Sequence, residues 1–181
     1  MSDRVRRLIT ALLAVVLGAG AALLVLIFFN ARDDSTFTPA AGPGEALPDQ
    51  GARHIPQSQA GQAKYATDPP ASGPHWPEPI NTRDRRGLTD DQIIHALELG
   101  DVVLFYGERK PPQDLVDLQR ELSGPFDPVL TAAGQQVILA RRPGTKGVLA
   151  LAWARRLAVA DAEDPRVHQF ADFWLGRGAN E

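Results

Sequence analysis

The feature that most constrains this chain is an apolar run near its start, residues 8–29, which contains no charged side chain. As a helix it would be about 33 Å long, close to the thickness of the hydrocarbon core of a bilayer. Arg4, Arg6 and Arg7 precede the run, whereas aspartates follow it. Because basic residues stay on the cytoplasmic side, we predict a single-pass protein of the cell membrane. Residues 1–7 are then cytoplasmic, and the C-terminal domain is extracytoplasmic.

The same run permits other interpretations. A cleaved signal peptide has a shorter apolar region of about 7–15 residues followed by a small-x-small cleavage site, and the residues after Phe29 do not fit such a site. An uncleaved signal-anchor in the lipid bilayer is therefore favoured. Ala14, Gly18 and Ala22 have the small-xxx-small spacing that lets two membrane helices approach closely. A homodimer through this face is one interpretation, and the ordinary abundance of small residues in such helices is the other.

The rest of the chain is expected to contain a linker, one globular domain and a tail. Residues 30–53 are rich in Pro, Gly and polar residues without an apolar period, which is typical of a flexible linker. Residues 54–176 form the domain, and residues 177–181 are the tail. The chain has no cysteine, which excludes disulfides and thiolate metal sites. The net charge of −3, without a basic cluster, argues against a nucleic-acid partner.

Apolar periodicity and turn signals predict the elements of the domain. In chain order these are a Pro-rich loop, a helix in 88–100, a strand at 101–107, a helix in 111–124, strands in 135–143 and 147–160, and a helix in 164–178. The two later strands flank Pro-Gly-Thr-Lys, which is predicted to be a hairpin turn. The expected fold is α+β, a small, mostly antiparallel sheet with flanking helices.

One candidate site combines the Pro-rich loop with the first helix of the domain. His95 and Glu98 are three residues apart and share a helix face. Imidazole and carboxylate are good ligands for zinc or copper, and His75, in a loop stiffened by prolines, is the natural third ligand. The alternative is a buried hydrogen-bond network that satisfies these polar groups where loop and helix pack.

No other motif in the sequence indicates a catalytic or cofactor-binding site. Ser72 lacks the Gly-x-Ser-x-Gly surroundings of a serine nucleophile, and there is no phosphate-binding or dinucleotide-binding glycine loop. His54, at the linker boundary, and His168, on the last helix, are expected at the surface. We therefore assign no catalytic residue and no residue that binds an organic cofactor.

Several segments of the domain resemble a bacterial family known only as domain of unknown function 3105. The resemblance rests on Tyr-Ala-Thr-Asp-Pro-Pro-Ala-Ser-Gly-Pro-His-Trp at 65–76, His-Ala-Leu-Glu-Leu-Gly at 95–100 and Phe-Ala-Asp-Phe-Trp-Leu at 170–175. It covers about residues 54–176. Members of this family are similar in build, with an N-terminal membrane anchor or signal, and the family has no established activity.

The resemblance also bears on the candidate site. Members of the family usually have His-Ala-Leu-Glu-His-Gly, which is the H-x-x-E-H arrangement of the inverted zincin motif, together with a loop histidine that matches His75. In this chain Leu99 replaces the second histidine, so zincin-like hydrolysis is not implied. What remains is a site of His75, His95 and Glu98, or one completed by His54.

Two functional hypotheses follow. The first, which we favour, is a membrane-anchored, non-catalytic binding or structural module of the cell envelope with no cofactor. The second is a metal-binding or metal-dependent enzymatic domain that holds Zn or Cu with His75, His95 and Glu98.

Overall fold

The computed structural model describes residues 42–81 and 87–179. The predicted anchor at 8–29, with its dimerisation face, and the predicted cytoplasmic residues 1–7 lie outside this part of the chain. Within the described residues, no helix has the length and apolar character needed to cross a membrane.

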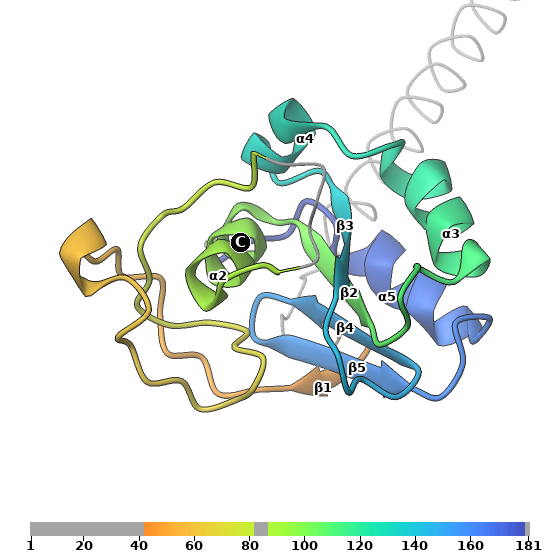
Figure 1. Cartoon of the computed structure of the whole chain (residues 1–181), viewed down its shortest axis with the longest axis horizontal. Helices are drawn as coiled ribbons and strands as arrows, with labels where there is room; N and C mark the ends of the chain where they lie inside the picture. The colour runs from red at the N-terminus through yellow and green to blue at the C-terminus, as the bar shows by residue number, and fades with distance from the viewer. Residues whose placement is uncertain (1–41, 82–86, 180–181) are drawn as a thin grey trace, which may run out of the picture. The chain divides into compact units, whose positions relative to one another are not determined.

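The described domain has mixed α and β structure, which confirms the predicted fold class (Figure 1). A five-stranded sheet has the order β1-β5-β4-β2-β3. The strands are β1 (Glu45–Ala46), β2 (Val102–Tyr106), β3 (Val137–Arg141), β4 (Val148–Ala152) and β5 (Arg155–Val159). The helices are α2 (Asp90–Leu99), α3 (Gln113–Ser123), α4 (Pro128–Ala132) and α5 (Pro165–Trp174), with a 3₁₀ turn, η2, at Gln57–Gln59. All strand pairs among these are antiparallel except β2–β3, which is parallel.

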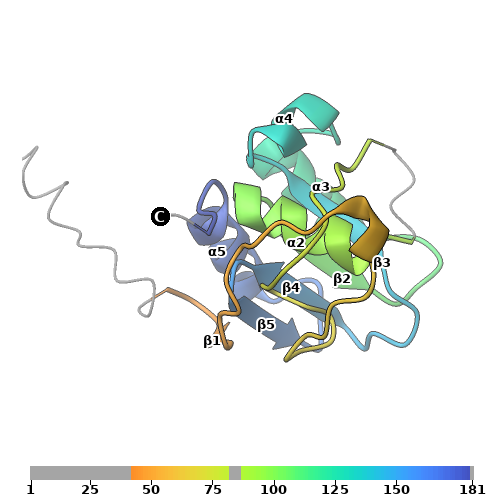
Figure 2. The same ribbon diagram turned by 90° about the vertical axis from the view of Figure 1, so that its left-hand side faces the viewer.

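Strand β2 is the centre of the fold and is buried at every position. Helix α2 covers one face of the sheet, and α3 and α5 lie on the other (Figure 1 and Figure 2). Val103 and Phe105 of β2 therefore share a core with Ile93 and Leu97 of α2. A continuous apolar run such as this strand is typical of a strand covered on both faces. The strand follows α2 after only two residues, so α2 is held directly against the sheet.

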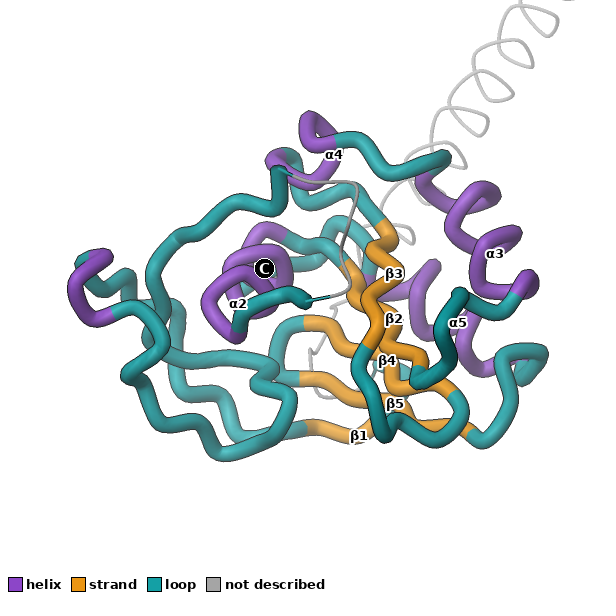
Figure 3. The backbone as a smooth tube through the Cα atoms, in the orientation of Figure 1, coloured by secondary structure: helices purple, strands orange, loops and turns teal. Residues whose placement is uncertain are grey.

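The predicted hairpin around Pro-Gly-Thr-Lys is wrong. Strands β3 and β4 both pair with β2, one on each side, and do not pair with each other. The connection between them passes the end of β2, where the Arg142 N–H donates to the Tyr106 carbonyl at 2.9 Å (Figure 3). The segment 147–160 instead forms two strands, β4 and β5, joined at Trp153 and Ala154. Ala154 has a φ of 51°, and this turn has neither the Gly nor the Asn that usually signals one.

The predicted linker also differs from the structure, because residues 42–53 belong to the folded domain. Strand β1 pairs with β5, and the Leu47 N–H donates to the Ala154 carbonyl at 2.9 Å. The Trp174 indole N–H donates to the Pro43 carbonyl at 2.8 Å. These contacts are hydrogen bonds to main-chain groups, which do not depend on a pattern of apolar residues. The hydropathy pattern therefore could not predict them.

A buried carboxyl group lies between α2 and β2. Asp101 is 1% exposed, and its Oδ1 accepts from the Gln136 N–H at 2.8 Å. Its Oδ2 is buried without a hydrogen-bond partner among the described residues. Burial raises the pKa of Asp101 from its ordinary value of 3.8 to about 8, although the hydrogen bond from Gln136 acts in the opposite direction. Between these two values the folded protein therefore holds a proton on Asp101 that the unfolded chain has released.

This difference predicts a pH dependence of stability. Because the pKa of Asp101 is raised on folding, its contribution is fully present below pH 3.8 and is lost as the pH rises to about 8. The slope is at most about 1.4 kcal/mol per pH unit. Asp101→Asn keeps an oxygen acceptor for Gln136 but cannot ionise, so its free energy of unfolding should fall less between pH 5 and 8. Urea unfolding of both proteins in EDTA tests this, and parallel pH profiles would contradict it.

Candidate metal centre

Four side chains that can bind a metal converge on one side of α2. His54, His75, His95 and Glu98 each offer one ligand atom, and these atoms lie within 4.8 Å of one another. Glu98 Oε2 is 2.9 Å from His54 Nε2, 3.1 Å from His75 Nε2 and 3.3 Å from His95 Nδ1. The structure thus brings the three candidate residues together and adds His54. We call these four residues the His₃Glu cluster.

The main chain holds His54 beside His75. The Ile55 N–H donates to the His75 carbonyl at 2.9 Å, and the His75 N–H donates to the Arg53 carbonyl at 3.1 Å, which makes an isolated parallel bridge between the two histidines. Residues paired in this way project to the same side, and the two rings meet edge to face with centroids 5.1 Å apart. Neither segment has an alternating strand pattern, so only the resemblance, not periodicity, pointed to His54 as a donor.

Helix α2 carries the other two donors. A capping box of Thr89 and Gln92 begins the helix, and Gly100, with a φ of 114°, is its C-cap. The last turn is also covered by the C-terminal segment, since the Ala179 N–H donates to the Glu98 carbonyl at 3.0 Å. The segment from residue 177 to 179 is therefore packed on the cluster's helix and is not a free tail.

Asp91 connects α2 to the loop that carries His75. Its side chain is buried, and Oδ1 accepts from the Trp76 N–H at 2.8 Å while Oδ2 accepts from the Gly61 N–H at 2.8 Å. On the other side of the loop, the Tyr65 hydroxyl donates to the Pro74 carbonyl at 3.1 Å. Burial, with the nearby carboxylates of Asp91 and Asp90, raises the pKa of Tyr65 to about 12, so this donor stays protonated. The residue before His75 and the residue after it are both fixed.

The protonation of His75 follows from its contacts. Its Nδ1 lies 3.0 Å from the Gly73 carbonyl oxygen, which can only accept, so Nδ1 carries the proton. In a neutral ring the lone pair of Nε2 then faces the carboxylate oxygen of Glu98 at 3.1 Å. Two acceptors repel each other at this distance. A proton or a metal ion between these two atoms would make the contact favourable.

The pKa values of two members suit metal binding. Burial raises the pKa of Glu98, but the hydrogen bond from His54 and the charges of His54 and His75 outweigh it, so its pKa lies below the usual value. Burial lowers the pKa of His95, more than its hydrogen bond to Glu98 raises it. An ionised carboxylate and a neutral imidazole are the forms that bind a metal.

The spacing of the cluster fits a small divalent ion. Zn–N bonds of about 2.0–2.1 Å imply ligand atoms about 3.4 Å apart in a tetrahedron. The separations of 2.9–3.3 Å between Glu98 Oε2 and the three nitrogens are close to this value, and all four ligand atoms lie within 4.8 Å of one another. Three imidazoles and one carboxylate suit Zn²⁺ or Cu²⁺. With no cysteine in the chain, the donor set is nitrogen and oxygen only.

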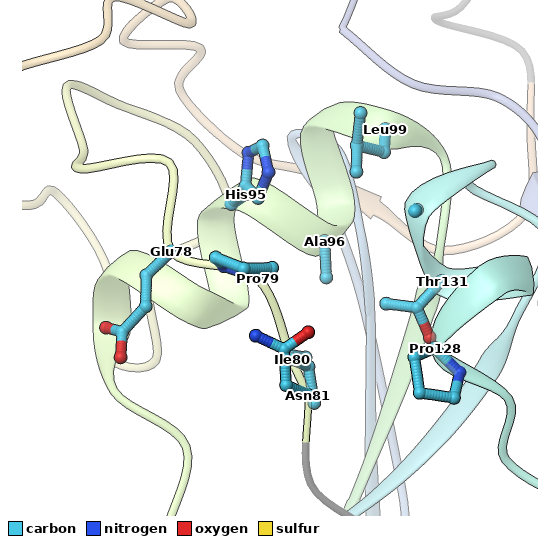
Figure 4. A pocket seen from close by; sticks show the side chains of 10 residues that line it. Glu78, Pro79, Ile80, Asn81, His95, Ala96, Leu99, Pro128 and Thr131 are labelled. Carbon is cyan, nitrogen blue, oxygen red and sulfur yellow. The ribbon is translucent and has the colours of Figure 1, made fainter.

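Leu99 does not belong to the His₃Glu cluster. With His95 and Ala96 it lines a cavity of about 200 Å³, whose other walls come from residues 78–81 and from Pro128 and its neighbours in α4 (Figure 4). Its side chain is partly exposed. Position 99 therefore borders this cavity, and the fourth donor of the cluster is supplied by His54 from outside the helix.

The other polar candidates have structural roles. The Ser72 hydroxyl donates to the Pro48 carbonyl at 3.1 Å and accepts from the Gln50 N–H at 3.0 Å, which braces the Pro-rich loop. His168 lies at the surface of α5, with Nε2 3.3 Å from Glu121 Oε1, as expected for a surface histidine.

Comparison with known proteins identifies the family. Neither the curated proteins nor the solved structures contain a match to this chain. Residues 56–181 match the family described as protein of unknown function, DUF3105. The match covers more than half of the chain and includes His75, His95 and Glu98. The protein therefore belongs to the domain of unknown function 3105 family.

Proposed function

We propose that this protein binds one Zn²⁺ or Cu²⁺ ion through His54, His75, His95 and Glu98 and does not turn over a substrate. The observation that carries the proposal is the convergence of three imidazole nitrogens on the single atom Glu98 Oε2. A carboxylate offers about four acceptor positions over its two oxygens. A purely structural network could use both oxygens, whereas a tetrahedral metal site needs one donor atom from each residue.

The number of donors supports binding over catalysis. Structural zinc sites have four protein ligands, while catalytic sites have three and keep one position open for water or substrate. This cluster supplies four. The proposal therefore joins parts of both hypotheses drawn from the sequence. The protein is a non-catalytic binding module, as in the first, and it binds a metal through His75, His95 and Glu98, as in the second.

We also propose that the domain works outside the cytoplasm, attached to the membrane by residues 8–29. The support is the uncharged apolar run and the arginines before it. A domain without cysteine needs no disulfide in that compartment and offers no thiolate to compete with the His₃Glu cluster for the metal.

The test is metal binding by the full-length chain, purified in detergent and stripped with EDTA. We expect one Zn²⁺ or Cu²⁺ per chain by equilibrium dialysis, and a rise in the melting temperature on adding the metal. At a free metal concentration of 100 times Kd the stabilisation should be about 2.7 kcal/mol. His168→Ala, which removes a histidine outside the cluster, should bind equally. A chain that binds no ion and shows no thermal shift would contradict the proposal.

A further inference from the structure

The four donors of the cluster differ sharply in exposure. The side chain of His75 is 0% exposed, Glu98 12% and His95 18%, whereas that of His54 is 51% exposed. The site therefore has a closed side, formed by the loop and α2, and an open side on which His54 lies.

The inner donors also differ from His54 in what positions them, although the ring of His95, like that of His54, has one hydrogen bond among the described residues, to Glu98 Oε2 at 3.3 Å. The ring of His75 is fixed by the Gly73 carbonyl, and His95 and Glu98 stand on the rigid helix α2. Among the described residues, the ring of His54 makes one hydrogen bond, to Glu98 Oε2, and otherwise touches the rings of His75 and His95.

The backbone of His54, in contrast, is fixed by the parallel bridge to His75. Its side chain can therefore leave the cluster by rotation about its own bonds, without unfolding the segment, and its exposure leaves room for that rotation. His54 also lies outside residues 56–181, the range matched to the family, while the other three donors lie inside it.

We propose that His54 is a removable fourth ligand and that the position it leaves accepts an incoming imidazole. This inference rests on the proposed metal site. In the exchange the bond between the metal and His54 Nε2 breaks and a bond from the metal to the incoming imidazole nitrogen forms, with no change in oxidation state or in protons. The three inner donors then hold the ion while it is loaded from, or passed to, a histidine of another molecule.

Cobalt titration of the full-length chain in detergent tests this proposal, because four-coordinate Co²⁺ has intense visible absorption. We expect the wild-type chain to give this tetrahedral spectrum. His54→Ala should bind Co²⁺ at least about 10-fold more weakly, with a weaker band, and added imidazole should restore both the band and the affinity. His54→Ala should also release the ion to a chelator faster than the wild type.

Two contrasts make the result specific. His75→Ala removes a fully buried ring, and His95→Ala removes a mostly buried one. Imidazole from solution should therefore not restore Co²⁺ binding in either variant. Circular dichroism verifies that each variant is folded. Equal rescue of a folded inner variant, or no rescue of His54→Ala, would overturn the removable-ligand proposal and leave the metal site standing. A wild-type chain that binds neither Co²⁺ nor Zn²⁺ would refute the metal site itself, and this inference with it.

Discussion

Glu98→Gln is expected to weaken Zn²⁺ binding by at least about 100-fold, equivalent to about 2.7 kcal/mol. Glu98 is the only anionic donor of the cluster, and its Oε2 is the atom on which the three imidazole nitrogens converge. A bound ion would lie about 2 Å from that charge, where even a strongly screened Coulomb attraction exceeds this free energy. The glutamine side chain keeps the size and one carbonyl oxygen but not the charge.

The chain offers a matched control for this substitution. Glu121 also contacts a histidine, His168, at 3.3 Å, but on the surface of α3 and α5 and outside the cluster. Glu121→Gln should therefore leave the affinity for zinc unchanged. Competition against a zinc-binding chromophore measures both variants, with circular dichroism as the test of folding. An affinity for Zn²⁺ that does not change in Glu98→Gln would show that the ion is bound by other residues.

The elements that could be predicted from the sequence are those with local signals. The capping box of Thr89 and Gln92, the left-handed Gly100 and the continuous apolar run of β2 are all properties of neighbouring residues. The spacing that places His95 and Glu98 on one face of α2 is also local. These signals were sufficient to place His95 and Glu98 together on α2, and the Pro-rich loop supplied His75 as the third candidate residue.

What the sequence did not predict depends on main-chain contacts between distant segments. The bridge that aligns His54 with His75 uses N–H and C=O groups that every residue other than proline has. The same is true of β1, whose pairing with β5 lies in a segment with a linker's composition. The strand order β3-β2-β4 could not be predicted either, because a turn such as Pro-Gly-Thr-Lys can join two strands that pair or two strands separated by a third.

Asp91 suits the positive end of the helix dipole by its place in the sequence, and its buried position gives it a second role. It is 2% exposed, and its two carboxylate oxygens accept from two separate loop positions, Gly61 and Trp76. Trp76 follows His75 directly, so the carboxylate of Asp91 fixes the backbone at the buried donor. We therefore expect Asp91 to be a positioning residue for the cluster and not a ligand.

Asp91→Ala is expected to lower the free energy of unfolding by about 2–4 kcal/mol, because two backbone N–H groups lose their shared acceptor, the buried carboxylate of Asp91. Asp90→Ala is the control, since Asp90 stands in the same first turn of α2 but accepts no hydrogen bond from the described residues of the loop, 54–81. It should cost less than about 1 kcal/mol.

The two roles of Asp91 can be separated by measuring urea unfolding with EDTA and with Zn²⁺. If Asp91 positions His75, then Asp91→Ala should also weaken zinc binding by about 10- to 100-fold, as the loss of residues that orient ligands commonly does. Asp91→Ala would then show two effects. Its free energy of unfolding in EDTA would be lower, and a fixed concentration of Zn²⁺ would raise that free energy less in Asp91→Ala than in Asp90→Ala. If Zn²⁺ raised the free energy of unfolding equally in the two variants, the main-chain hydrogen bonds to Arg53 and Ile55 would be sufficient to hold His75. Asp91 would then contribute to stability alone.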